Sequence, residues 1–294
     1  WLITSFVLVY LMVLVGGLTR LTDSGLSITQ WQLLSGMIPP LTNESWNYYF
    51  NLYKEIPQYK LINPNMTLGD FKVIYYWEYA HRFLARLLGL FFILPFIYFY
   101  FIKKINKDYL NICFLISILI LLQGLVGWYM VKSGLINKVS VSHYRLSLHL
   151  SIAFIISSMI FWVILNFKEK RIKNFFIIKK KSFIFNFLII LVFFQVIFGA
   201  FVSGLDAGQI YQTWPLMNET YFPDDVNLNR VSYLLNFNDQ SLIQFYHRNI
   251  AYLIIIYISF LGIYIYKNKI NYLFSHYYIV LTFIFFQIFL GILT

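Results

Sequence analysis

Seven long apolar segments constrain what this chain can fold into. They run over about Trp1–Leu18, Val73–Ile102, Tyr109–Val131, Val141–Phe167, Phe183–Val202, Leu242–Tyr266 and Tyr272–Thr294. About 20 apolar residues at about 1.5 Å each cross a hydrocarbon core of about 30 Å as a helix. Hydrophobic residues make up 60% of the chain and charged residues only 12%, about half the charged fraction of a soluble domain. This pattern predicts an all-α integral membrane protein with seven visible membrane-spanning helices.

The charges are distributed unevenly along the chain, whose net charge is +11. Twelve of the 23 Lys and Arg residues lie in the connections after the second, fourth and sixth segments. Ten of the twelve acidic residues lie toward the opposite side. Because cytoplasmic loops carry the excess of Lys and Arg, we expect a cytoplasmic N-terminus in a cell inner membrane, with the long loops 19–72 and 204–240 in the periplasm. The positive charge is then a topology signal, and no nucleic-acid partner is expected.

The chain also repeats itself, which predicts its domain organisation. A Gln-x-x-x-Gly motif recurs in three odd-numbered segments, and a histidine lies in each of three even-numbered ones. These residues are Gln123 and Gly127, Gln195 and Gly199, Gln287 and Gly291, and then His81, His149 and His247. We predict two tandem pseudo-symmetric four-helix bundles, 1–167 and 183–294, joined by a basic cytoplasmic linker at 168–182. The second bundle is one helix short, so we expect an eighth helix with a fourth histidine beyond Thr294, and further residues before Trp1.

The three histidines lie at a similar depth, roughly 9–13 Å inside the outer ends of their helices at 1.5 Å per residue. Neutral imidazole ligates iron, and haem iron accepts axial ligands from both faces. Four-helix bundles build such sites between facing helices. We therefore expect His81 and His149 to form one haem site, and His247 with the missing histidine to form a second. A single membrane histidine is often only a hydrogen-bond donor between helices, but three at one depth favour iron ligands.

Charged residues accompany the first histidine inside its apolar segment. Glu78, His81 and Arg82 are spaced i, i+3, i+4 and share one helix face, which Arg86 continues one turn on. Ionisable residues at membrane depth mark a functional site by default. Glu78 either pairs with Arg82 or has a catalytic role, and the desolvation cost of a buried pair favours catalysis. Four arginines on the outer side are candidates to bind haem propionates: Arg20, Arg82, Arg86 and Arg248.

Six stretches give the chain a resemblance to a known family. They are Gly16 to Ser27, Ile38 to Leu41, Trp77 to Arg82, Ser142 to Leu150, Gly199 to Gly208 and Phe245 to Arg248. With these motifs the chain resembles the haem A synthases over essentially its whole length. Some relatives carry a cysteine pair in the first outer loop, whereas loop 19–72 contains no cysteine. The chain is therefore most similar to the branch of proteobacterial and mitochondrial enzymes.

The resemblance implies an oxidoreductase that makes haem A for cytochrome c oxidase. Haem O would be converted by two successive hydroxylations of its C8 methyl group, and the gem-diol would lose water to leave a formyl group. The resemblance implies that the N-terminal half holds the substrate, with Glu78, His81 and His149 as catalytic residues. It also implies that His247 in the C-terminal half is an axial iron ligand of a haem b cofactor. Glu78 would handle a proton near C8 or steer the substrate, and haem O synthase, the protohaem farnesyltransferase, would deliver it.

Two other classes of protein share part of this pattern. A non-catalytic dihaem b-type electron carrier would contain histidine pairs across helices, but it gives no reason for Glu78 three residues before a ligand. A transporter built from parallel repeats would explain charges inside the membrane, but not histidines at matched depth. The haems that the purified protein contains would discriminate among the three.

Overall fold

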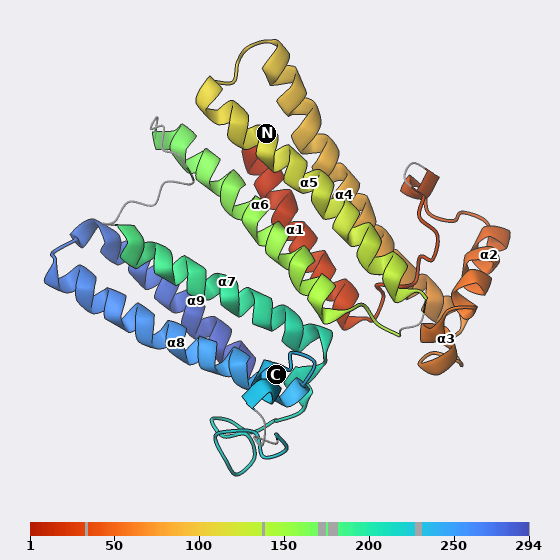
Figure 1. Ribbon diagram of the computed structural model, residues 1–294. Coiled ribbons are helices and arrows are strands. Elements are labelled where there is room, and N and C mark those ends of the chain that lie inside the picture. Colours follow the sequence, from red (N-terminus) through yellow and green to blue (C-terminus); the bar gives the residue numbers. More distant parts are fainter. Residues whose placement is uncertain (33–34, 137–138, 170–174, 176–181, 227–230, 294) are drawn as a thin grey trace. The chain divides into compact units, whose positions relative to one another are not determined.

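The computed structural model describes residues 1–32, 35–136, 139–169, 175, 182–226 and 231–293. The chain divides into two compact units, Trp1–Phe175 and Phe176–Thr294 (Figure 1). Most of the linker expected at 168–182 lies outside the described residues.

Within the described residues, seven helices are long and apolar enough to cross a membrane. In the first unit they are α1 (Leu2–Leu21), α4 (Leu68–Phe101), α5 (Lys107–Gly134) and α6 (His143–Glu169), and in the second α7 (Phe183–Gly204), α8 (Gln240–Lys267) and α9 (Phe274–Leu293). Between them lie short 3₁₀ turns: η1 (Ser35–Met37), η3 (Ala207–Gln209), η4 (Val231–Leu235) and η5 (Asn271–Leu273). The prediction of an all-helical, multi-pass membrane protein is confirmed. The helix expected beyond Thr294 stays a prediction.

Polar caps start two of the spanning helices ahead of their apolar segments. Thr67 and Asp70 form a capping box at α4, in which the Asp70 amide donates to Thr67 Oγ1 at 3.3 Å and the Thr67 amide donates to Asp70 Oδ2 at 3.0 Å. At α8 the Leu242 amide donates to Asp239 Oδ1 at 2.9 Å. Such side chains satisfy amides that have no partner inside the helix. Both helices are therefore already formed where their histidines occur.

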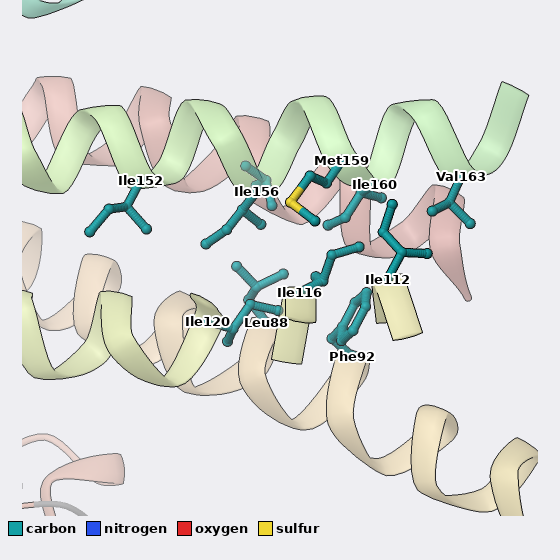
Figure 2. Close-up of a cluster of buried hydrophobic side chains, with 11 residues drawn as sticks. Leu88, Phe92, Ile112, Ile116, Ile120, Ile152, Ile156, Met159, Ile160 and Val163 are labelled. Atoms are coloured by element: carbon teal, nitrogen blue, oxygen red, sulfur yellow. The ribbon is translucent and has the colours of Figure 1, made fainter. Parts of the chain in front are cut away.

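A core of branched apolar side chains joins the helices of the first unit (Figure 2). In Figure 2, Leu88 and Phe92 of α4 lie near side chains of α5 and α6. The α5 and α6 residues are Ile112, Ile116, Ile120, Ile152, Ile156, Met159, Ile160 and Val163. Phe92, Ile116 and Ile160 have no exposed surface. This core lies in the part of α4 from Leu88 onward and in the parts of α5 and α6 that pack against it. The start of α4, which follows loop 19–72, is therefore available for polar groups.

The long loop of the first unit contains two helices that the apolar pattern did not predict. They are α2 (Asn43–Lys54) and α3 (Pro57–Leu61). The first is amphipathic and buries Trp46, Phe50 and Tyr53 at helical spacing. These side chains form a second core with Phe71 and Tyr75 of α4 and with residues of the loop. The loop is therefore a folded layer that packs against the first part of α4, just before Glu78 and His81.

Candidate functional site

Glu78 of α4 is a buried carboxylate, and only 3% of its surface is exposed. Its Oε2 accepts hydrogen bonds from the Ser27 hydroxyl at 2.7 Å and from the Ile28 amide at 2.8 Å. Its Oε1 accepts from Arg82 at 2.6 Å in an ion pair one helical turn apart. The carboxylate therefore binds both the outer loop and the next guanidinium on its own helix.

The two arginines that follow Glu78 on α4 also bind the outer loop. Arg82 donates to the Ile28 carbonyl at 2.9 Å, and its guanidinium lies 5.3 Å from the ring centre of Trp31. Arg86 donates to the Gln32 carbonyl at 2.9 Å. Charge-assisted hydrogen bonds of this kind are roughly twice as strong as neutral ones. One face of α4 thus anchors the loop from Ser27 to Gln32.

Each of the three histidines lies against a glycine of a neighbouring helix. A Cβ atom added to Gly16 of α1 would lie 3.1 Å from His81 Nε2. A Cβ on Gly127 of α5 would lie 3.2 Å from His149 Cε1, and one on Gly199 of α7 would lie 3.2 Å from His247 Cε1. These distances are shorter than almost all real Cβ contacts. The glycines therefore make room for the imidazole rings, which is a sharper role than close helix approach alone.

The glutamines of two of the three repeated motifs, Gln123 and Gln195, also lie beside a histidine. Gln123 donates to the His149 carbonyl at 2.9 Å, and the Gln195 amide nitrogen lies 3.2 Å from His247 Nε2. Nδ1 of both His149 and His247 is buried and has no hydrogen-bond partner among the described residues. His81 lies within electrostatic range of His149. The first unit therefore brings imidazoles of α4 and α6 within electrostatic range of each other.

The second unit anchors its own outer loop with polar residues of α8. Gln244, 5% exposed, accepts from the Tyr211 amide at 3.2 Å and donates to the carbonyls of Gly208 and Tyr211 at 3.1 and 3.0 Å. Arg248 donates to the carbonyls of Tyr211, Thr213 and Leu216 at 2.8, 2.8 and 3.2 Å. These two residues flank His247 on one helix face.

Within this second loop, the carboxylates of Asp224 and Asp225 both bind the Tyr211 hydroxyl. The Tyr211 hydroxyl lies 2.8 Å from Asp224 Oδ1 and 2.7 Å from Asp225 Oδ1. Burial and then the hydrogen bonds to the two carboxylates raise the pKa of Tyr211 above its ordinary value. The hydrogen bond from Tyr211, followed by that from Asn218, lowers the pKa of Asp224. The contact therefore favours a neutral tyrosine and an ionised aspartate at neutral pH.

The structure brings some of the predicted site residues together and leaves others apart. It brings Glu78 and Arg82 into contact and places His81 near His149, whereas Arg20 pairs with Asp23 at 2.9 Å at the end of α1. Sequence reasoning missed four polar contributors: Ser27, Gln123, Gln195 and Gln244. The motif glutamines had been noticed only as a repeat. The signal for Gln244 was its position three residues before a histidine, which is also the position of Glu78.

Comparison with known proteins identifies the family of the chain. Residues 1–294 match the family described as "Cytochrome oxidase assembly protein". The chain belongs to this family. It is 48% identical to the "Heme A synthase" of Pelagibacter ubique over 100% of this chain and 86% of the relative. It is 42% identical to that of Parvibaculum lavamentivorans over 87% and 74%, and 40% identical to that of Wolbachia pipientis wMel over 100% and 83%. No solved structure matches the chain.

These relatives confirm the family that the motifs predicted, and they are mostly alphaproteobacterial. The site has the features that a haem would need in a member of this family. Among the described residues, no cluster of three or more His, Cys, Asp or Glu could hold a bare metal ion. Haem iron needs only one or two axial ligands from the protein. The imidazoles are half-buried and lie in space that a Cβ would fill, and two of them, His149 and His247, have a buried ring nitrogen without a hydrogen-bond partner among the described residues, which fits that requirement.

The glycine seats give a prediction with a matched control in the same helix. Gly127→Leu should displace His149 and lower the haem bound per protein, because a Cβ there already meets the imidazole at 3.2 Å. Gly124→Leu should have little effect, because a Cβ at Gly124 meets nothing within 4 Å. Absorption spectra and haem-to-protein ratios of the two purified variants check this. Equal haem content in both would show that the glycine does not seat the ring.

Proposed function

We propose that this protein is a haem A synthase, an oxidoreductase that converts haem O to haem A by oxidising the C8 methyl group to a formyl group. One observation carries the proposal. Three half-buried histidines each lie against a glycine of a neighbouring helix, in a chain whose relatives at 40–48% identity carry the name "Heme A synthase".

We assign the substrate to the N-terminal half, 1–167, and a haem b cofactor to the C-terminal half, 183–294. His81 and His149 would hold haem O from helices α4 and α6. His247 would be one axial ligand of haem b, which supplies electron transfer when bound. The contribution of the chain is to hold and orient the two macrocycles. The folded layer of α2 and α3 would exclude water from the first site.

Of the two roles expected for Glu78, the geometry favours steering the substrate. Its two oxygens accept hydrogen bonds from Ser27, Ile28 and Arg82. A carboxylate engaged in this way holds the outer loop beside His81. We therefore assign to Glu78 the role of positioning the substrate. Proton transfer during the oxidation is then carried out by other donors and acceptors.

The four arginines remain our candidates to pair with haem propionates: Arg20, Arg82, Arg86 and Arg248. Arg82, Arg86 and Arg248 also hold loop carbonyls. A guanidinium carries five N–H donors, so a loop contact and a propionate contact do not exclude each other. Their position on the outer side would orient both propionates toward the long loops.

We place the protein in the cell inner membrane, with the N-terminus in the cytoplasm and loops 19–72 and 204–240 in the periplasm. The seven spanning helices and the basic connections support this topology. Haem O carries a farnesyl chain and partitions into lipid. Delivery from haem O synthase within the bilayer would therefore keep the substrate out of water.

Chromatography of the haems extracted from purified wild-type and His247→Ala protein tests the proposal. We expect haem b together with haem O or haem A in the wild type, and selective loss of haem b in the variant. Haem b alone, with no haem A formed after addition of haem O and reductant, would support the dihaem electron carrier instead. A protein without Soret absorption would support the transporter.

A further inference from the structure

The outer loops of the two units leave their helices in the same way. Asp23 and Asp206 each lie two residues after the last residue of α1 or α7. Their φ angles are 49° and 53°, in the left-handed region that Asp tolerates better than most residues. Five residues after each Asp comes the residue that the histidine helix binds, Ile28 in the first unit and Tyr211 in the second.

Ile28 and Tyr211 are bound by residues at the same two positions relative to the histidine. The residue three positions before the histidine accepts a hydrogen bond from the backbone amide of the loop residue. Glu78 accepts from the Ile28 amide at 2.8 Å, and Gln244 accepts from the Tyr211 amide at 3.2 Å. The arginine just after the histidine donates to the backbone carbonyl of the same loop residue. Arg82 reaches Ile28 at 2.9 Å, and Arg248 reaches Tyr211 at 2.8 Å.

The chemistry of each loop matches the side chain that holds it. The first loop presents two donors to Glu78, the Ser27 hydroxyl and the Ile28 amide, and an ionised carboxylate only accepts. The second loop presents one donor, the Tyr211 amide, and two acceptors, the carbonyls of Gly208 and Tyr211. A primary amide both donates and accepts. Glu78 and Gln244 therefore occupy equivalent positions on their helices, and the donors and acceptors of each loop account for the carboxylate in one and the amide in the other.

We propose that Gln244 is a positioning residue of the His247 site, which fixes the outer loop of the second unit across the histidine as Glu78 does in the first. Gln244 and Arg248 lie one turn apart and flank His247 on one face of α8. Their bonds to Gly208, Tyr211 and Thr213 hold that face against the loop. Release of the loop from Gln244 should shift the face of α8 that carries the imidazole. The effect on haem rests on the proposed function of His247.

Gln244→Met in the full-length, haem-loaded protein tests the proposal, because Met has a similar length and neither donates nor accepts strongly. Hydrogen exchange of the Tyr211 amide should accelerate by about tenfold. The haem b absorption bands and midpoint potential should shift while haem remains bound. Gln244→Glu should behave in the same way, because its carboxylate would face two carbonyls. Gln212→Met is the matched control, since Gln212 lies in the same loop with its side chain exposed.

The outcomes separate this proposal from the proposed function. Faster exchange with shifted haem spectra in both Gln244 variants, and wild-type behaviour of Gln212→Met, would support it. Unchanged exchange, or faster exchange with an unchanged haem spectrum, would overturn it. A His247→Ala variant that keeps haem b would refute the cofactor assignment instead, and the exchange of the Tyr211 amide would still decide whether Gln244 holds the loop.

Discussion

Replacing His81 with alanine is expected to abolish haem A formation and to leave the haem b bound through His247 in place. The reason is that every residue assigned to the substrate site lies in the first unit, Trp1–Phe175, and His247 lies in the second. Loss of partners that only support a metal ligand costs about 10–100-fold in affinity or activity, and loss of the ligand itself should cost at least as much. His149→Ala should give the same result, because His149 lies near His81 from the opposite helix.

The measurement is haem A production by cells that express each variant, together with the haem b content of the purified protein. His276→Ala is the control, since its exposed side chain lies near the start of α9 and away from the glycine seats. Loss of haem b with haem A formation preserved would reverse the assignment of the two halves. Loss of both haems together with a lowered unfolding temperature would mean that the variant unfolds and that His81 is structural.

The membrane architecture could be predicted from the sequence because the bilayer imposes one length scale on each apolar segment. All seven spans lie within a few residues of their expected positions. The exceptions are the ends: α4 starts at Leu68, five residues early, because the Thr67 capping box extends it. Helices α2 and α3 were missed for the opposite reason. They are short and lie outside the membrane pattern, and their apolar face becomes evident only when Trp46 and Phe50 pack on Phe71.

The candidate site was predictable in its residue types and less so in their contacts. Histidines at equal depth, and Glu78 beside one of them, stood out because polar groups are rare inside apolar segments. The partners of Glu78 did not stand out. Ser27 and Ile28 lie about 50 residues away in sequence, and one of them contributes only a backbone amide, which every residue except proline carries. Gln244 was harder to predict because its side chain is uncharged and lies near a helix end, so that only its position three residues before His247 points to it.

The buried pair of Glu78 and Arg82 carries the second large prediction. Glu78→Ala should destabilise the first unit by about 3–5 kcal/mol, because removing one member leaves the other charge buried without compensation. Arg82 has only 11% of its side chain exposed. Loss of Glu78 also leaves the Ile28 amide without its acceptor, and leaves the Ser27 hydroxyl only the Ile74 carbonyl at 3.3 Å. Thermal unfolding of the detergent-solubilised variant measures this. Glu55→Gln is the control, since Glu55 is exposed at the end of α2.

Glu78→Gln and Arg82→Gln together distinguish steering from proton transfer. Each weakens one half of the anchor of Ile28: Glu78→Gln replaces the carboxylate that accepts its amide with a neutral acceptor, and Arg82→Gln removes the guanidinium that donates to its carbonyl. If Glu78 steers the substrate through the loop, both variants should lose haem A formation to a similar extent, and both should exchange the Ile28 amide faster. If Glu78 transfers a proton, Glu78→Gln should lose activity with Ile28 still protected, and Arg82→Gln should keep most of it. The contacts of the carboxylate, all directed to the loop and to Arg82, lead us to expect the first result.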